Sequence, residues 1–117
     1  MRTILVIDDH IPTLESLCLV LSGRNYRTLP AENAAQASAM FAANEVDLVI
    51  VDHGLPGVSG SELADQFKRL RLVPVLMLSG SALLQARPDS VDLLLAKPCS
   101  VPELMEGIES LLPSPNL

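Results

Sequence analysis

The sequence lacks any long run of apolar residues. Although 49% of its 117 residues are hydrophobic, the longest apolar runs fall far short of the roughly 18 residues that a membrane-spanning helix needs. This indicates a globular chain, long enough for one domain with a core but too short for two. Because Met1–Thr3 leads into a short apolar run and two acids rather than a small-residue cleavage site, we expect a cytoplasmic protein without membrane contact.

Cysteines and basic residues are also scarce. Cys18 and Cys99 are far apart and show no paired metal-ligand spacing, so we interpret them as thiols in a reducing compartment, with Cys18 buried in the core. The chain has 8 Lys and Arg residues against 14 Asp and Glu, a formal net charge of −6. Nucleic-acid binding depends on neutralising phosphates, so we expect no direct nucleic-acid contact by this domain.

Five short apolar runs predict strands, four of them buried on both faces of a sheet. The four buried runs each end in a reactive side chain: Ile4–Ile7 before Asp8 and Asp9, Leu48–Val51 before Asp52, Val75–Leu78 before Ser79, and Leu93–Ala96 before Lys97. The fifth run, Tyr26–Ala31, is more polar and contains Pro30, which cannot donate a ladder hydrogen bond. This strand is therefore predicted at a sheet edge.

A helix is predicted after each strand from apolar residues at helical spacing. The predicted helices cover residues 12–22, 34–41, 60–70, 81–86 and 101–112. Capping boxes mark three of the helix starts, at Asn33, Ser59 and Ser100. The apolar stripe of the third helix is expected to run inward as far as Leu70.

Strands and helices alternate along the whole chain, which predicts an α/β fold. Such alternation implies a five-stranded parallel sheet, doubly wound, with five helices distributed over both faces. The strand order 2-1-3-4-5 suits a polar second strand at the edge. We assign residues 1–112 to the domain and 113–117 to a frayed tail or the start of a linker.

This strand order would bring Asp8, Asp9 and Asp52 into one crevice beyond the carboxyl ends of the strands. Carboxylates that close repel each other unless a cation intervenes, and oxygen ligands with open positions suit Mg²⁺. Lys97 adds a charge that pairs with phosphate, and Ser79 adds a hydroxyl donor. The set predicts phosphoryl transfer to a carboxylate, with Asp52 as the nucleophile.

With these features the chain resembles the receiver (phosphoacceptor) domain of bacterial two-component response regulators, over essentially its whole length. The resemblance is carried by Ile4–Asp9, Asp52, Leu55–Gly57 with Gly60, Ser79–Gly80 and Lys97–Pro98. It implies a flavodoxin-like fold and a signalling switch. Such a domain is not an enzyme, apart from catalysing its own phosphorylation and autodephosphorylation.

The resemblance also implies roles for particular residues. Asp52 would accept a phosphoryl group from a phosphohistidine on a sensor histidine kinase or phosphotransfer protein. Asp8 and Asp9 would hold Mg²⁺ together with Asp52 and the backbone carbonyl of Gly54. Gly54 and Gly57 have no side chains, which would allow the loop backbone to approach the metal and the phosphoryl group closely.

Ser79 and Lys97 would bind the phosphoryl oxygens, next to a cis bond between Lys97 and Pro98. A second copy of the chain or a downstream protein would bind the face of the helices predicted at 81–86 and 101–112. Leu94 departs from the family, because members usually carry an aromatic residue there that swings inward on phosphorylation.

A pseudo-receiver and an aspartyl-phosphate phosphatase are alternative interpretations of these residues. A pseudo-receiver would bind partners independently of phosphorylation. This alternative is favoured by Leu94, which stands where the family usually has an aromatic residue. An aspartyl-phosphate phosphatase usually has a second acid two positions after its nucleophile, where this chain has Gly54. His10 and His53 lack a ligand spacing and are interpreted as exposed or hydrogen-bonded, with His53 as a gate beside Asp52.

Overall fold

Five parallel strands form a single sheet in the order β2-β1-β3-β4-β5. The computed structural model describes residues 1–80 and 86–112. The strands are β1 (Thr3–Ile7), β2 (Arg27–Ala31), β3 (Leu48–Asp52), β4 (Val75–Ser79) and β5 (Leu93–Ala96). The predicted strand order is confirmed, and β2 with its Pro30 lies at the edge as predicted.

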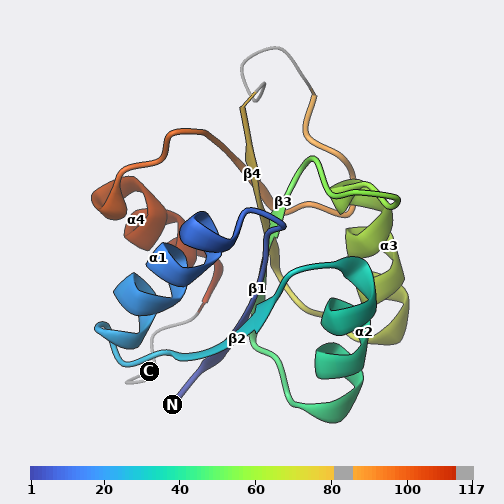
Figure 1. Ribbon diagram of the computed structural model, residues 1–117, viewed down its shortest axis with the longest axis horizontal. Helices are drawn as coiled ribbons and strands as arrows, with labels where there is room; N and C mark the ends of the chain where they lie inside the picture. The colour runs from blue at the N-terminus through green and yellow to red at the C-terminus, as the bar shows by residue number, and fades with distance from the viewer. Residues whose placement is uncertain (81–85, 113–117) are drawn as a thin grey trace.

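Helices cover both faces of the sheet (Figure 1). The helices are α1 (Ile11–Ser22), α2 (Ala34–Ala43), α3 (Gly60–Leu70) and α4 (Val101–Leu111). Helices α1 and α4 lie on one face, and α2 and α3 lie on the other. No helix within residues 1–80 and 86–112 is long and apolar enough to cross a membrane.

The sequence predicts five helices, whereas the described part of the chain contains four. The helix predicted at 81–86 lies outside the described residues except for Ala86, which belongs to no helix. Residues 113–117, assigned to a tail or linker, also lie outside the described residues.

The core has two layers, because strand side chains point alternately to the two faces of the sheet. Leu5 and Met77 pack with residues of α2 and α3, whereas Ile4 and Leu76 pack with residues of α1 and α4. All five residues of β1 are buried. A strand covered on both sides needs apolar residues at every position, which is the pattern that the sequence shows.

Side chains cap three helices where the sequence predicted it. Ser100 and Glu103 form the complete reciprocal box at the start of α4. Ser59 accepts a hydrogen bond from the Glu62 N–H, 3.2 Å away. The side chain of Asn33 likewise caps α2 by accepting a hydrogen bond from the N–H of Gln36. The side chain of Gln36 in turn accepts a hydrogen bond from the N–H of Glu32.

The burial of Leu70 and of Cys18 differs from the prediction. Leu70 is 69% exposed, because α3 ends at this residue and the buried stripe ends one turn earlier, at Phe67. Cys18 is partly rather than fully buried, on the side of α1 that borders the polar edge strand. Burial nevertheless raises the pKa of the Cys18 thiol, against the opposing effect of a hydrogen bond with Thr28.

Arg71 joins α2 to α3, a contact that the sequence did not reveal. Its guanidinium lies 4.1 Å from the centre of the Phe41 ring. The same group donates hydrogen bonds to the carbonyl of Asn44, at 2.9 Å, and to the carbonyl of Phe41. Arg71 therefore provides donors for carbonyls at the end of α2 that have no partner within the helix.

We predict that Arg71→Ala lowers the free energy of unfolding by about 2 kcal/mol, because two carbonyls lose a charged donor and an aromatic ring loses its cation. Urea unfolding of the purified domain measures this. The exposed neighbour Arg69 provides the control, since Arg69→Ala should change the stability by less than about 0.5 kcal/mol. Equal effects of the two substitutions would show that Arg71 does not act as this link.

Candidate functional site

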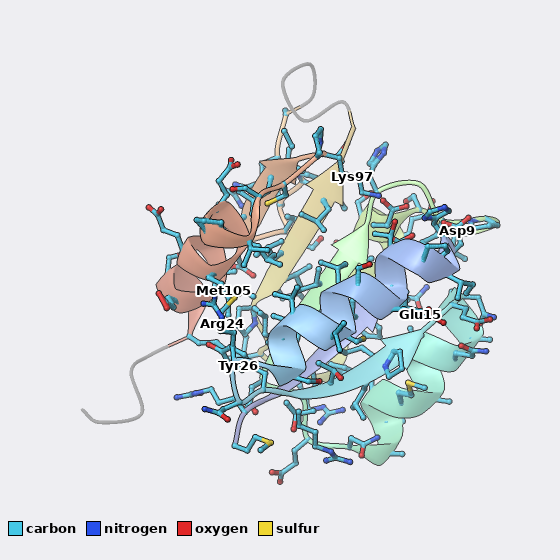
Figure 2. The ribbon with its side chains drawn as sticks, turned by 60° about the vertical axis from the view of Figure 1, so that its left-hand side comes forward. Asp9, Glu15, Arg24, Tyr26, Lys97 and Met105 are labelled. Atoms are coloured by element: carbon cyan, nitrogen blue, oxygen red, sulfur yellow. The ribbon has the colours of Figure 1, made fainter. Side chains whose placement is uncertain are left out.

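The residues predicted to act together follow neighbouring strands at one edge of the sheet. The strands are in register: Ile7 pairs with Val51, Asp52 with Leu78, and Ser79 with Ala96. The chemical groups that follow these strand ends are therefore delivered to the same edge. In Figure 2, Asp9 and Lys97 lie at this end of the molecule, whereas Arg24 and Tyr26 lie at the opposite end.

Asp8, Asp9 and Asp52 converge as predicted. One carboxylate oxygen from each residue lies within 4.8 Å of the other two. Their exposure differs: Asp8 is buried with only 2% of its surface exposed, Asp9 is exposed, and the side chain of Asp52 is 12% exposed. Asp52 is thus held mostly within the protein while part of its carboxylate remains accessible to solvent.

The buried carboxylate of Asp8 is only half satisfied. Its Oδ1 accepts a hydrogen bond from the backbone N–H of His10, at 2.9 Å. Its Oδ2 is buried and accepts no hydrogen bond from any residue that the structure describes. The ammonium of Lys97 lies 3.6 Å from this oxygen, beyond ordinary hydrogen-bond length, so the atom is suited to a closer cation.

Lys97 is the positive charge of the site. Its Nζ donates a hydrogen bond to Asp52 Oδ1 and lies 3.6 Å from Asp8 Oδ2. Partial burial alone would lower the pKa of the ammonium, but the hydrogen bond to Asp52 and the charges of Asp8 and Asp52 outweigh it. The pKa of Lys97 is therefore raised above its ordinary value.

The backbone fixes Lys97 and Ser79 relative to each other. The N–H of Lys97 donates to the carbonyl of Ser79, at 2.9 Å, which extends the β4–β5 ladder by one residue. The following Lys97–Pro98 bond is cis, as the resemblance implied. Ser79 itself is 1% exposed at the end of β4.

The loop from His53 to Ser59 carries the glycines of the site. Gly57 has a φ of +80°, a conformation that favours glycine. Gly54 is different: a Cβ there would meet no atom within 4 Å, so the surrounding protein does not demand glycine at this position. Assignment of the Gly54 carbonyl to the metal remains a prediction.

Neither histidine belongs to the acidic cluster that the described residues form. His10 is exposed and its Nδ1 lies 2.7 Å from the hydroxyl of Thr13, in agreement with the interpretation as a hydrogen-bonded side chain. His53 is exposed directly after Asp52. Its proposed role as a gate stays a prediction.

The residues at this edge fit a magnesium ion. Three oxygen-bearing side chains lie close together, one of them carries a buried oxygen without a donor, and the crevice is open on the side of Asp9. Mg²⁺ prefers one or two carboxylates and keeps water or phosphate oxygens at its other positions. Soft thiol ligands, which would favour other metals, are absent from this group.

The doubly wound sheet and the acidic crevice at the ends of its strands define a receiver-type signalling domain. The family model "Response regulator receiver domain" matches residues 4–109, and the chain belongs to this family. Members of the family are parts of two-component systems, as the resemblance implied.

Among curated relatives, the chain is 35% identical over 118 residues to the phosphate regulon transcriptional regulatory protein PhoB of Pseudomonas aeruginosa. The match covers 95% of this chain and 52% of PhoB. The chain thus spans about half the length of that relative.

Among solved structures, the chain resembles the response regulator TrrA of Thermotoga maritima in complex with Mg²⁺ and beryllofluoride. The TM-score is 0.86 and the identity 31%, over 96% of this chain and 100% of TrrA. A complex of TrrA with the histidine kinase ThkA matches with a TM-score of 0.87 and 29% identity, over 97% of this chain and 100% of the TrrA chain.

We predict that Lys97 stabilises the folded domain at neutral pH and that this stabilisation is lost at alkaline pH. Because its pKa is raised on folding, this contribution is fully present below its ordinary value of 10.5 and is lost as the pH rises through the higher value of the folded protein. In metal-free buffer, Lys97→Met should lower the free energy of unfolding by about 1–2 kcal/mol at neutral pH, allowing for partial solvent screening.

Urea unfolding of both proteins at neutral pH and near pH 11.5 measures the difference, which should shrink at the higher pH. Lys68→Met provides a control, because Lys68 pairs with Asp92 at the surface and its loss should cost no more than about 1 kcal/mol. A difference for Lys97→Met that stays constant up to the highest pH would contradict the assignment.

Proposed function

We propose that this domain is a phosphorylation-dependent switch of a two-component system, in which Asp52 accepts a phosphoryl group. The observation that carries the proposal is the position of the Asp52 carboxylate. It is partly open to solvent, bonded to Lys97, and within 4.8 Å of two further acids. A carboxylate placed in this way has a counter-charge on one side and access for a donor on the other.

The chemistry requires an attack by Asp52 on phosphorus. A carboxylate oxygen forms the new P–O bond while the P–N bond of a phosphohistidine breaks, and the electron pair returns to the imidazole nitrogen of the donor. A Mg²⁺ ion held by Asp8, Asp9, Asp52 and the Gly54 carbonyl would neutralise charge on the phosphoryl oxygens. Water attack on the resulting acyl phosphate reverses the modification.

Lys97 has a different partner before and after this reaction. In the unmodified protein its ammonium donates a hydrogen bond to Asp52, which orients the carboxylate. When the carboxylate becomes an acyl phosphate, the negative charge moves outward onto the phosphoryl oxygens, and the ammonium follows it. The Ser79 hydroxyl donates to another of these oxygens, so β4 and β5 both respond to the modification.

We propose a sensor histidine kinase or a phosphotransfer protein as the donor. The complex of the similar protein TrrA with the histidine kinase ThkA supports this class of partner. A second copy of the chain or a downstream protein would bind the face that includes α4. The net charge of −6 opposes direct contact of the domain with nucleic acid.

A pseudo-receiver remains the second candidate, and Leu94 is the observation that favours it. Leu94 pairs with Met77 across β4 and β5 and is partly buried against the core on the α3 side. Leu94 cannot act as the aromatic residue that, by the resemblance, swings inward on phosphorylation at this position. If the domain switches, the change must pass through Ser79, Lys97 and the strands that carry them.

We predict that Asp52→Asn abolishes phosphorylation by a small-molecule donor such as acetyl phosphate, because the amide cannot form the acyl phosphate. Intact-protein mass spectrometry detects the added phosphoryl group. Removing Mg²⁺ with EDTA should slow phosphorylation of the wild type by at least about 100-fold.

Asp89→Asn is the matched control, since Asp89 is an exposed acid outside the crevice. It should be phosphorylated at the wild-type rate. Equal modification of Asp52→Asn and the wild type would eliminate Asp52 as the acceptor. If the wild type accepts no phosphoryl group with Mg²⁺ present, the pseudo-receiver becomes the better description.

A further inference from the structure

Gly60, the first residue of α3, lies directly against the backbone of Asp52. A Cβ at this position would be 2.5 Å from the carbonyl oxygen of Asp52 and 3.3 Å from its carbonyl carbon. It would also lie 3.0 Å from Cε of Met77. Carbon and oxygen atoms normally stay about 3.3 Å or more apart, so only glycine fits here.

The peptide group between Asp52 and His53 is held on both sides. Its N–H, which belongs to His53, donates to the carbonyl of Leu78 on β4, at 3.0 Å. Its carbonyl oxygen, which belongs to Asp52, contacts Gly60. Because the peptide group is planar and rigid, these two contacts together fix its orientation at the end of β3.

A further hydrogen bond ties the start of α3 to the same segment. The N–H of Gly60 donates to the carbonyl of His53, at 3.2 Å. The first turn of α3 therefore cannot move away from β3 without losing this bond. A methyl group added at Gly60 can be accommodated in two ways: either this hydrogen bond breaks, or the peptide group between Asp52 and His53 tilts.

Either response would shift the Asp52 carboxylate relative to groups that come from other strands. Asp8 follows β1 and Lys97 follows β5, so neither moves with the end of β3. Metal coordination tolerates distance changes of only about 0.2 Å. A small displacement of Asp52 is therefore sufficient to impair the site.

We infer that Gly60 is a positioning residue for Asp52: the lack of a side chain lets the first turn of α3 rest on the Asp52 carbonyl, which sets the carboxylate in place for the metal, Lys97 and the phosphoryl group. This inference rests on the proposed function. It adds a residue that touches neither the substrate nor the cation.

Gly107 provides a matched control for the extra methyl group. It also lies in a helix, α4, and is packed against the sheet, where a Cβ would be 2.9 Å from Cδ2 of Leu93. Its neighbours are the ends of flexible leucine side chains, which can move. Gly107→Ala therefore adds the same group to a buried helix position without pressing on the backbone of the site.

The experiment compares Gly60→Ala, Gly107→Ala and the wild type, each as residues 1–117. Mg²⁺ affinity is measured by NMR titration, phosphorylation by acetyl phosphate is measured by mass spectrometry, and stability is measured by urea unfolding. Gly60→Ala should bind Mg²⁺ about 10- to 100-fold more weakly and be phosphorylated correspondingly more slowly. Gly107→Ala should stay within about twofold of the wild type in both.

A metal-free measurement separates positioning from stability. The carbonyl ¹³C shift of Asp52 and the amide ¹⁵N shift of His53 should both change in Gly60→Ala and stay unchanged in Gly107→Ala. These shifts report the contact whether or not the protein is phosphorylated. If the wild type neither binds Mg²⁺ nor accepts a phosphoryl group, the proposed function fails, and the shifts still show whether Gly60 orients this peptide.

The double variant Gly60→Ala with Met77→Val tests which contact matters. Shortening Met77 removes the side-chain contact but leaves the contact with the Asp52 carbonyl, so the defect should persist. Recovery of Mg²⁺ affinity in the double variant would overturn the inference, as would wild-type affinity in folded Gly60→Ala. If Gly60→Ala does not fold, the double variant takes its place, and failure of both to fold would assign Gly60 to stability alone.

Discussion

Mutual repulsion among three carboxylates is the constraint on which the rest of this structure depends. Asp8, Asp9 and Asp52 present oxygens within 4.8 Å of one another, and Lys97 supplies one opposing charge. Three negative groups and one positive group leave an excess of about two negative charges in a partly buried crevice. The folded domain can hold this arrangement because its core stabilises it, and the excess negative charge favours the binding of a cation.

The sheet provides that stability because it is covered on both faces. The central strands β1, β3 and β4 are buried along almost their whole length, and their side chains fill two separate core layers. A parallel sheet of this kind places all its strand ends in one rigid row. Asp8 and Asp9 follow β1, Asp52 ends β3, Ser79 ends β4 and Lys97 follows β5, so four neighbouring strand ends supply the acids, the hydroxyl and the ammonium.

The functional proposals differ in what they require of this row. A phosphorylation switch needs an acceptor, a counter-charge and a route for the response, and Asp52, Lys97 and β5 can provide these. A pseudo-receiver needs only the fold and its surface, so this function does not explain why three carboxylates and an ammonium lie together at the strand ends. Leu94 is partly buried against the core and is not among the acids that converge in the crevice.

The sequence by itself determined the sheet order, the edge position of the strand with Pro30 and the convergence of the acids with Lys97. These follow from local rules: apolar runs mark buried strands, proline marks an edge, and strand ends in a parallel sheet meet. The tertiary structure decided what depends on contacts between distant segments. It decided that Arg71 covers Phe41, that Leu70 is exposed where α3 ends, and that Gly60 lies on the Asp52 carbonyl. No periodicity in the sequence encodes these features, because they depend on where α3 ends and on how neighbouring elements pack against each other in space.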